Sequence, residues 1–171
     1  MLFKDRVFDL LSSQDEGVFL PHYKRLVNLR FRAEPMNATG GSKDSVWMPH
    51  CHHVSHAYAQ AFGVEVVDGE KVFIAQTKTR WFGNFISGKV LRYAHSWNLL
   101  SLPSGKRVIL DLFPDETCSM LPIVVLDPHP AYTVHWDGLV HRGVQELFAK
   151  PDEQERLNIL VAEFKRIDKL E

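Results

Sequence analysis

Apolar residues near the start of the chain recur at the spacing of an amphipathic helix. The stripe over residues 3–12 predicts a short helix that Ser13 and Asp15 end, and a second stripe predicts another helix over residues 19–32. Residues 34–45 then combine proline, asparagine, glycine and serine, a composition typical of a loop. The beginning of the chain is therefore expected to be helical as far as this loop.

The middle of the chain changes from helical to strand-like spacing. Residues 51–62 are rich in alanine and histidine and are expected to form a helix that Gly63 ends. Residues 64–67 and 72–77 are β-branched or alternate in polarity, and the Asp-Gly pair at 68–69 between them is typical of a hairpin turn. We therefore expect a helix that leads directly into antiparallel strands.

Two long strands and two helices complete the predicted order. Residues 90–102 and 107–113 have the pattern of strands, with a turn at the Ser-Gly pair 104–105. Residues 143–148 and 152–169 have the pattern of helices. Because helices and strands are grouped rather than alternating, the order predicts an α+β fold.

Composition places the chain among ordinary globular proteins. With 171 residues, 45% hydrophobic and 24% charged, one domain over residues 1–171 is expected. The 20 basic and 21 acidic residues lack the basic excess of a nucleic-acid binder. The two cysteines, Cys51 and Cys118, do not make a disulfide framework. Since we find neither a signal-peptide core nor ~20 consecutive apolar residues, a cytoplasmic location without membrane contact is expected.

Cys51 is the first candidate for chemistry because it stands at the start of a predicted helix. A thiol attacks as thiolate, and its pKa falls at a helix N-terminus beside a histidine. The positive end of the helix dipole favours the negative sulfur. Cys51 alone is more often a small buried residue, so the interpretation depends on a base elsewhere in the chain.

His95 and Asp111 are the candidates for that base and for the group that orients it. His95 lies in the first long strand and Asp111 in the second, where a carboxylate among apolar residues is costly unless it is paired. The two positions do not match in simple register around 104–105, so a wider loop or a bulge is needed to bring them together. With Cys51 they would form a nucleophile, a base and an orienting group.

The segment His95-Ser96-Trp97-Asn98-Leu99, followed by Gly105 and Asp111, resembles the His-x-Trp, Gly, Asp block of transglutaminase-like cysteine enzymes. The order Cys, His, Asp also resembles that of arylamine N-acetyltransferases, and the resemblance covers roughly residues 47–115. It implies a papain- or transglutaminase-like core, in which the helix that carries Cys51 packs on an antiparallel sheet that carries His95 and Asp111. Helices at both ends of the chain would flank this core.

The resemblance implies a cysteine-dependent hydrolase or acyltransferase. Its substrate would be a peptide or a small amide or acyl compound, and it needs no metal or other cofactor. Trp47, His52 and Trp97 are the expected substrate-binding residues, and Asn37 is a candidate donor to the oxyanion. The sequence identifies neither the substrate nor the oligomeric state.

Two alternatives follow from the histidines around Cys51. Family members carry small or aromatic residues after the cysteine, whereas this chain has His52 and His53, which leaves open a binding module with a degenerate triad. In the cluster from His50 to His56, His52 and His56 have the i, i+4 spacing of zinc-binding helices, and Cys51 could add a sulfur ligand. No glutamate follows the first of these two histidines, so the metalloprotease motif is incomplete.

Overall fold

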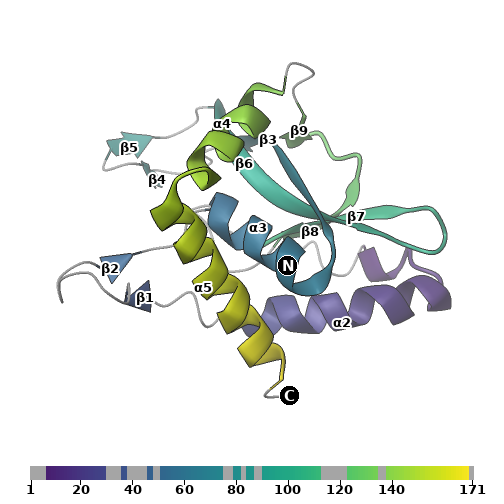
Figure 1. Cartoon of the computed structure of the whole chain (residues 1–171). Coiled ribbons are helices and arrows are strands. Elements are labelled where there is room, and N and C mark those ends of the chain that lie inside the picture. Colours follow the sequence, from purple (N-terminus) through teal and green to yellow (C-terminus); the bar gives the residue numbers. More distant parts are fainter. Residues whose placement is uncertain are drawn as a thin grey trace.

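The computed structural model describes most of the chain and combines helices with one main antiparallel sheet (Figure 1). The described residues are 7–29, 36–37, 46–47, 51–74, 79–81, 84–86, 90–112, 123–134 and 138–169. The side chains at 29, 36–37, 46–47, 73–74, 79–81, 84–86 and 90–91 are outside the description. The α+β class predicted from the sequence agrees with this arrangement.

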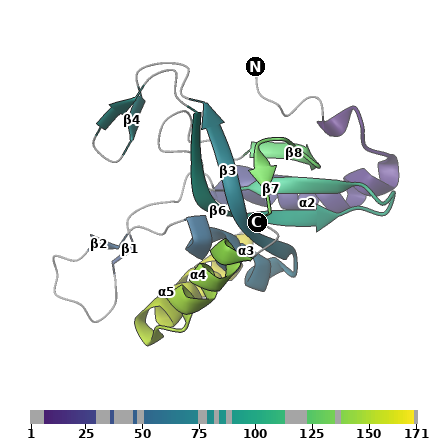
Figure 2. The same cartoon turned by 90° about the horizontal axis from the view of Figure 1, so that it is seen from above.

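The main sheet has five strands in the order β8-β7-β6-β3-β9, and every neighbouring pair is antiparallel. Its strands are β3 (Glu65–Ile74), β6 (Val90–Ser101), β7 (Arg107–Asp111), β8 (Ile123–Asp127) and β9 (Tyr132–Thr133). Two small hairpins stand apart from it: β1 (Met36–Asn37) with β2 (Val46–Trp47), and β4 (Thr79–Trp81) with β5 (Asn84–Ile86). The long strands β3 and β6 form the middle of the sheet (Figure 2).

The hairpin predicted at residues 68–69 is wrong. Asp68 and Gly69 lie inside the unbroken strand β3, where Asp68 pairs with Ser96 and Gly69 with His95 of β6. A Cβ atom at position 69 would lie 2.6 Å from Trp97 Cη2 and 2.5 Å from the Thr133 carbonyl oxygen. Glycine is therefore required here by the close approach of a side chain and a neighbouring strand, and not by a turn.

The first helix boundary also differs from the prediction. Residues 7 and 8 are helical and 3–6 lie outside the described residues, but α2 (Ser13–Leu29) begins where we expected a helix to end. The backbone N–H of Ser12 donates to Asp15 Oδ2 at 3.1 Å, and the N–H of Asp15 donates to Ser12 Oγ at 3.2 Å. This reciprocal pair is a capping box, so the polar residues start the helix.

The other helices agree with the sequence pattern to within a few residues. They are α3 (Cys51–Phe62), α4 (Leu139–Phe148) and α5 (Pro151–Asp168), and Gly63 after α3 has the positive φ of 69° expected of a C-cap. None of the helices in the described ranges is long and apolar enough to span a bilayer.

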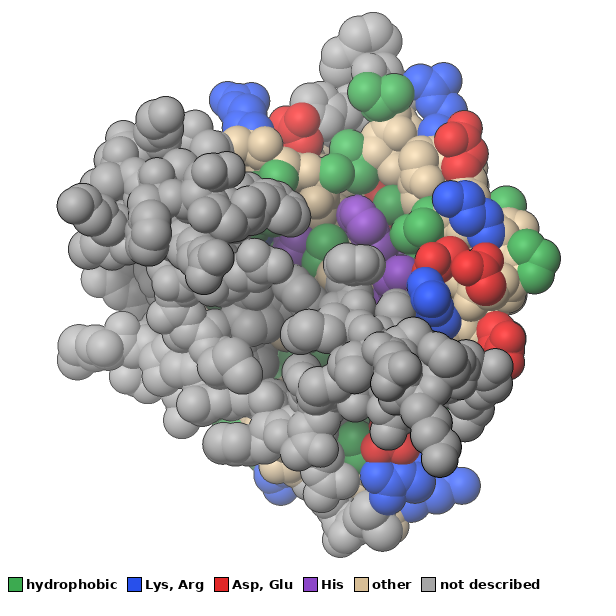
Figure 3. Space-filling model, turned by 90° about the vertical axis from the view of Figure 1, so that its left-hand side faces the viewer, with side chains coloured by type: hydrophobic (Ala, Val, Ile, Leu, Met, Phe, Trp, Pro, Cys, Tyr) green, Lys and Arg blue, Asp and Glu red, His purple; other side chains and the backbone are tan. Residues whose placement is uncertain are grey.

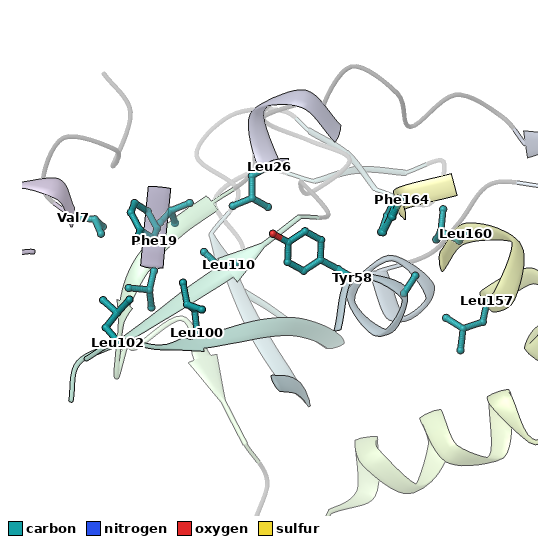
Figure 4. Packing of buried hydrophobic residues seen from close by; sticks show 13 residues of the cluster. Val7, Phe19, Leu26, Tyr58, Leu100, Leu102, Leu110, Leu157, Leu160 and Phe164 are labelled. Atoms are coloured by element: carbon teal, nitrogen blue, oxygen red, sulfur yellow. The ribbon is translucent and has the colours of Figure 1, made fainter. Parts of the chain in front are cut away.

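Helices α2, α3 and α5 pack over one face of the sheet and bury the main core between them (Figure 4). Phe19 and Leu26 of α2 meet Leu110 of β7 there, and Tyr58 of α3 meets Phe164 of α5. The opposite face carries a second cluster, formed by Trp97, Leu99, Ile109 and Val125. Both faces of β6 are therefore occupied, one by helices and the other by this smaller cluster.

Candidate active site

Cys51 is the first residue of α3, as the sequence predicts, and its thiol is free and half-buried. Ser55 makes two of the hydrogen bonds that hold the helix on β6: its Oγ donates to the Ser96 carbonyl at 2.7 Å, and its carbonyl accepts from Asn98 Nδ2 at 2.9 Å. The first backbone N–H groups of α3 have no partner within the helix, and groups of this kind favour negative charge at a helix N-terminus.

His95 and Asp111 lie on neighbouring strands and are hydrogen-bonded. The register of β6 and β7 pairs Asn98 with Leu110 and Ser101 with Arg107, so the hairpin is centred on Ser104. The loop spans residues 102–106, which is wider than a two-residue turn and meets the condition set by the sequence. Asp111 is then the diagonal neighbour of His95 on the same face, within side-chain reach. His95 Nε2 donates to Asp111 Oδ1 at 2.9 Å.

Asp111 is fully buried and accepts from two further donors. Lys71 Nζ lies 2.7 Å and Tyr132 Oη 2.9 Å from Asp111 Oδ2. Burial opposes ionisation, but the charges and hydrogen bonds of His95 and Lys71 outweigh it and lower the pKa of Asp111 to about 2. Neither donor was expected from the sequence. Lys71 stands directly before the strand-like run that begins at Val72, and a lysine at such a position is the pattern that could have indicated it.

The ring of His95 packs beside Trp97 and binds Asp111 through one nitrogen only. Trp97 stacks beside it with ring centroids 6.4 Å apart, and the side chain of His95 is 1% exposed. Burial lowers the pKa of His95, but the Asp111 carboxylate more than compensates and raises it to about 9. Nδ1, opposite the bond to Asp111, is buried and makes no hydrogen bond of ordinary geometry within the described part of the chain.

Cys51 lies close enough to His95 for each group to change the pKa of the other. Burial opposes the thiolate, but contacts with His52 and His95 outweigh it and lower the pKa of Cys51 to about 6. Nδ1 of His95 makes no hydrogen bond of ordinary geometry with the described residues, so its contact with the thiol is electrostatic, and loose geometry of this kind is common before a substrate is bound. Between the pKa values of about 6 and about 9, the favoured state is a thiolate beside an imidazolium.

A second buried carboxylate lies on the helix side of β6. Asp68 Oδ1 accepts from Ser96 Oγ at 2.5 Å and from His56 Nε2 at 2.8 Å, and Asp68 Oδ2 accepts from His141 Nδ1 at 2.9 Å. His52 Nδ1 lies 2.6 Å from the same Ser96 oxygen. Although burial opposes ionisation, the bonds from His56 and Ser96 lower the pKa of Asp68 to about 2. This network was not predicted, because an Asp-Gly pair between strand-like segments is typical of a turn.

The expected substrate-binding residues have different surroundings. His52 is half-buried beside Cys51, and histidine side chains reach the surface together among apolar residues in Figure 3. Trp97 is only 3% exposed and packs against His95 and Tyr132, and its role in substrate binding stays a prediction. Trp47 and Asn37 lie in β2 and β1, but their side chains are outside the description.

The histidines of the metal hypothesis take separate partners. His52 binds Ser96, His56 binds Asp68, and His53 Nε2 lies 2.7 Å from Glu153 Oε2. Among the described side chains, no group of three histidine, cysteine or acidic residues is arranged to hold a metal ion. His50 and Cys118 lie outside the described residues.

Replacing Gly69 by alanine is expected to disturb the site through Trp97. The added Cβ would push against Trp97 and the Thr133 carbonyl, and overpacking of this kind costs about 1–3 kcal/mol. Because Trp97 supports the His95 ring, we expect alkylation of Cys51 by iodoacetamide at mildly acidic pH to slow as well. Urea unfolding and alkylation rates measure the two effects.

Gly143→Ala is the matched control, because nothing lies within 4 Å of a Cβ at this exposed position of α4. Alanine should stabilise that helix by about 0.5–1 kcal/mol and leave the thiol unchanged. Normal reactivity of Cys51 in Gly69→Ala would contradict the supporting role of Trp97.

Comparisons with protein-family models, curated proteins and solved structures find no match to this chain. The resemblance to transglutaminase-like enzymes therefore stays a prediction from the sequence.

Proposed function

We propose that the protein is a cysteine-dependent hydrolase or acyltransferase that acts on an amide or related acyl bond. Cys51 attacks the carbonyl carbon as thiolate, and the His95 imidazolium donates its proton to the leaving group. Asp111 holds the ring of His95 and stabilises its charge. The acyl group then passes from the sulfur to water or to an amine.

The observation that carries the proposal is the combination of a low thiol pKa with a buried, hydrogen-bonded His–Asp pair. Cys51 has a pKa of about 6, and His95 is bound to a carboxylate that is 0% exposed. Strongly shifted pKa values with specific charged partners favour a catalytic site over a structural one. A thiol turned into the core would favour the binding module, but Cys51 is half-buried.

The arrangement of elements supports a papain- or transglutaminase-like core. The helix that begins at Cys51 packs on an antiparallel sheet, and two adjacent strands of that sheet carry His95 and Asp111. Backbone N–H groups at the start of α3 are the proposed oxyanion donors. The substrate is a peptide or a small amide or acyl compound, and Trp47 stays a prediction for its binding site.

Acyl transfer to Cys51 is the direct test of this function. With p-nitrophenyl acetate, we expect a burst of one p-nitrophenolate per chain and an acetyl group on the peptide that contains Cys51, as detected by mass spectrometry. Peptide amides with fluorogenic leaving groups then test amide cleavage. His95→Gln should lose the turnover of both substrates. Acetylation without any turnover of esters or amides would contradict catalysis and favour the binding module.

A further inference from the structure

The directions of the hydrogen bonds around Asp68 determine where His52 carries its proton. An ionised carboxylate only accepts, so the Ser96 hydroxyl, 2.5 Å from Asp68 Oδ1, uses its single proton on that bond. The Ser96 oxygen can then only accept from His52 Nδ1, which lies 2.6 Å away. In the neutral ring, Nδ1 therefore carries the hydrogen, and Nε2 of His52 is left as the basic nitrogen.

Asp68 orients His52 through the Ser96 hydroxyl, in the same way that Asp111 orients His95 directly. In both cases a buried carboxylate fixes the proton on one ring nitrogen and leaves the other nitrogen as a base. His95 and Ser96 are adjacent in β6, so the two carboxylates are reached on opposite faces of the strand. Cys51 is in electrostatic contact with both His52 and His95. Two oriented imidazoles thus act on the same thiol.

The two imidazoles differ in their access to solvent. The His95 side chain is 1% exposed, whereas His52 is half-buried. The network of His52 continues through Asp68 to His141, whose side chain is 55% exposed. A water molecule or an amine therefore reaches the histidines of this network more readily than it reaches His95.

We propose that His52 is a second catalytic base, which activates the acyl acceptor when the acyl group leaves Cys51. This inference rests on the proposed acyl-enzyme chemistry and divides it between two histidines: His95 serves acylation and His52 serves deacylation. Ser96 and Asp68 are positioning residues that keep the proton of His52 on Nδ1. His56 and His141 help to hold the Asp68 carboxylate by donating to it.

His52, Cys51 and His95 account for every proton that moves during deacylation. Nε2 of His52 takes a proton from the attacking water, whose oxygen forms a bond to the thioester carbon. The carbon–sulfur bond breaks, and its electron pair returns to Cys51 as thiolate. His95 is neutral at this stage, since its proton left with the first product. The proton on His52 passes through the sulfur to His95 and restores the thiolate–imidazolium pair.

Pre-steady-state kinetics with p-nitrophenyl acetate separate the two steps. The initial burst reports acylation, and the following steady phase reports deacylation. In His52→Gln, we expect a burst of normal amplitude under mildly alkaline conditions and a steady rate lower by about 100-fold, as is typical for the loss of a general base. Ser96→Ala keeps His52 but removes its link to Asp68, and should slow the steady phase about tenfold, the equivalent of one hydrogen bond.

The burst amplitude counts folded, reactive chains, so a loss of structure cannot be mistaken for slow deacylation. His22→Gln is the matched control, because His22 binds Tyr58 in α3 and takes no part in the proposed chemistry. A normal steady rate in His52→Gln would overturn the role of His52 and leave the proposed function standing. An acyl-enzyme that the unmodified protein never turns over would overturn both proposals.

Discussion

Alkylation of Cys51 by iodoacetamide is expected to depend on pH with a midpoint near 6, the pKa to which its contacts lower it. At that pH half of the thiol is ionised, far more than in an ordinary cysteine. A thiolate of low pKa is also a weaker nucleophile. The two effects together predict alkylation about tenfold faster than that of N-acetylcysteine at the same pH. The rate is measured in a Cys118→Ser background, so that only one thiol reacts.

Cys51→Ala in the same background should abolish labelling and lower any turnover by about 10⁵–10⁶-fold, as when a catalytic nucleophile is removed. The fold should persist, because the change removes one half-buried atom at the start of α3. His95→Gln should move the midpoint of alkylation upward, since the positive ring no longer favours the thiolate. A midpoint near that of a free thiol in the unmodified protein would contradict the activated state of Cys51.

The elements that carry the three residues could be predicted because each depends on local pattern. The sequence correctly predicts the helix that begins at Cys51 and ends before Gly63. It also predicts the strands that carry His95 and Asp111. Whether the side chains of His95 and Asp111 meet depends on the pairing register of β6 and β7, which the sequence does not determine. One residue of shift about Ser104 would turn Asp111 to the other face of its strand.

The surroundings of Asp68, the second buried carboxylate, could not be predicted from the local sequence pattern. An Asp-Gly pair between strand-like segments favours a turn, but here Gly69 makes room for Trp97 and Asp68 meets residues of β6, α3 and α4. These partners come from distant parts of the chain, so no local window contains them. An aspartate that directly follows two valines was the available indication, since a carboxylate beside apolar strand residues is costly unless it is paired.

Asp111→Asn is expected to reduce both stability and activity strongly. Asparagine has a similar shape, but it removes the negative charge that binds the ammonium group of Lys71, a residue that is 3% exposed. Breaking a buried ion pair from one side costs about 3–5 kcal/mol. The ring of His95 also loses the charge that stabilises its imidazolium, and a comparable change in serine proteases lowers kcat about 10⁴-fold. Urea unfolding and turnover of the p-nitrophenyl ester measure the two losses.

The pH dependence of unfolding gives a second test of the same pair. The pKa of Asp111 is about 2 in the folded chain and 3.8 as the ordinary value, so ionisation stabilises the fold above about pH 4. This stability, about 2–3 kcal/mol for a shift of this size, is lost as the pH falls from about 4 to 2. Near neutral pH, the free energy of unfolding of Asp111→Asn should therefore be lower than that of the unmodified protein. The difference between the two free energies should become smaller in acid.

Asp127→Asn is the control for both tests of Asp111, because it removes the same charge from the next strand. Asp127 pairs with Arg107, whose side chain is 50% exposed, and a pair of this kind contributes about 0–1 kcal/mol. Its replacement should leave the acid dependence and the turnover nearly unchanged. If Asp111→Asn behaved like this control, the carboxylate would neither balance Lys71 nor orient His95, and the proposed triad would be reduced to Cys51 and His95.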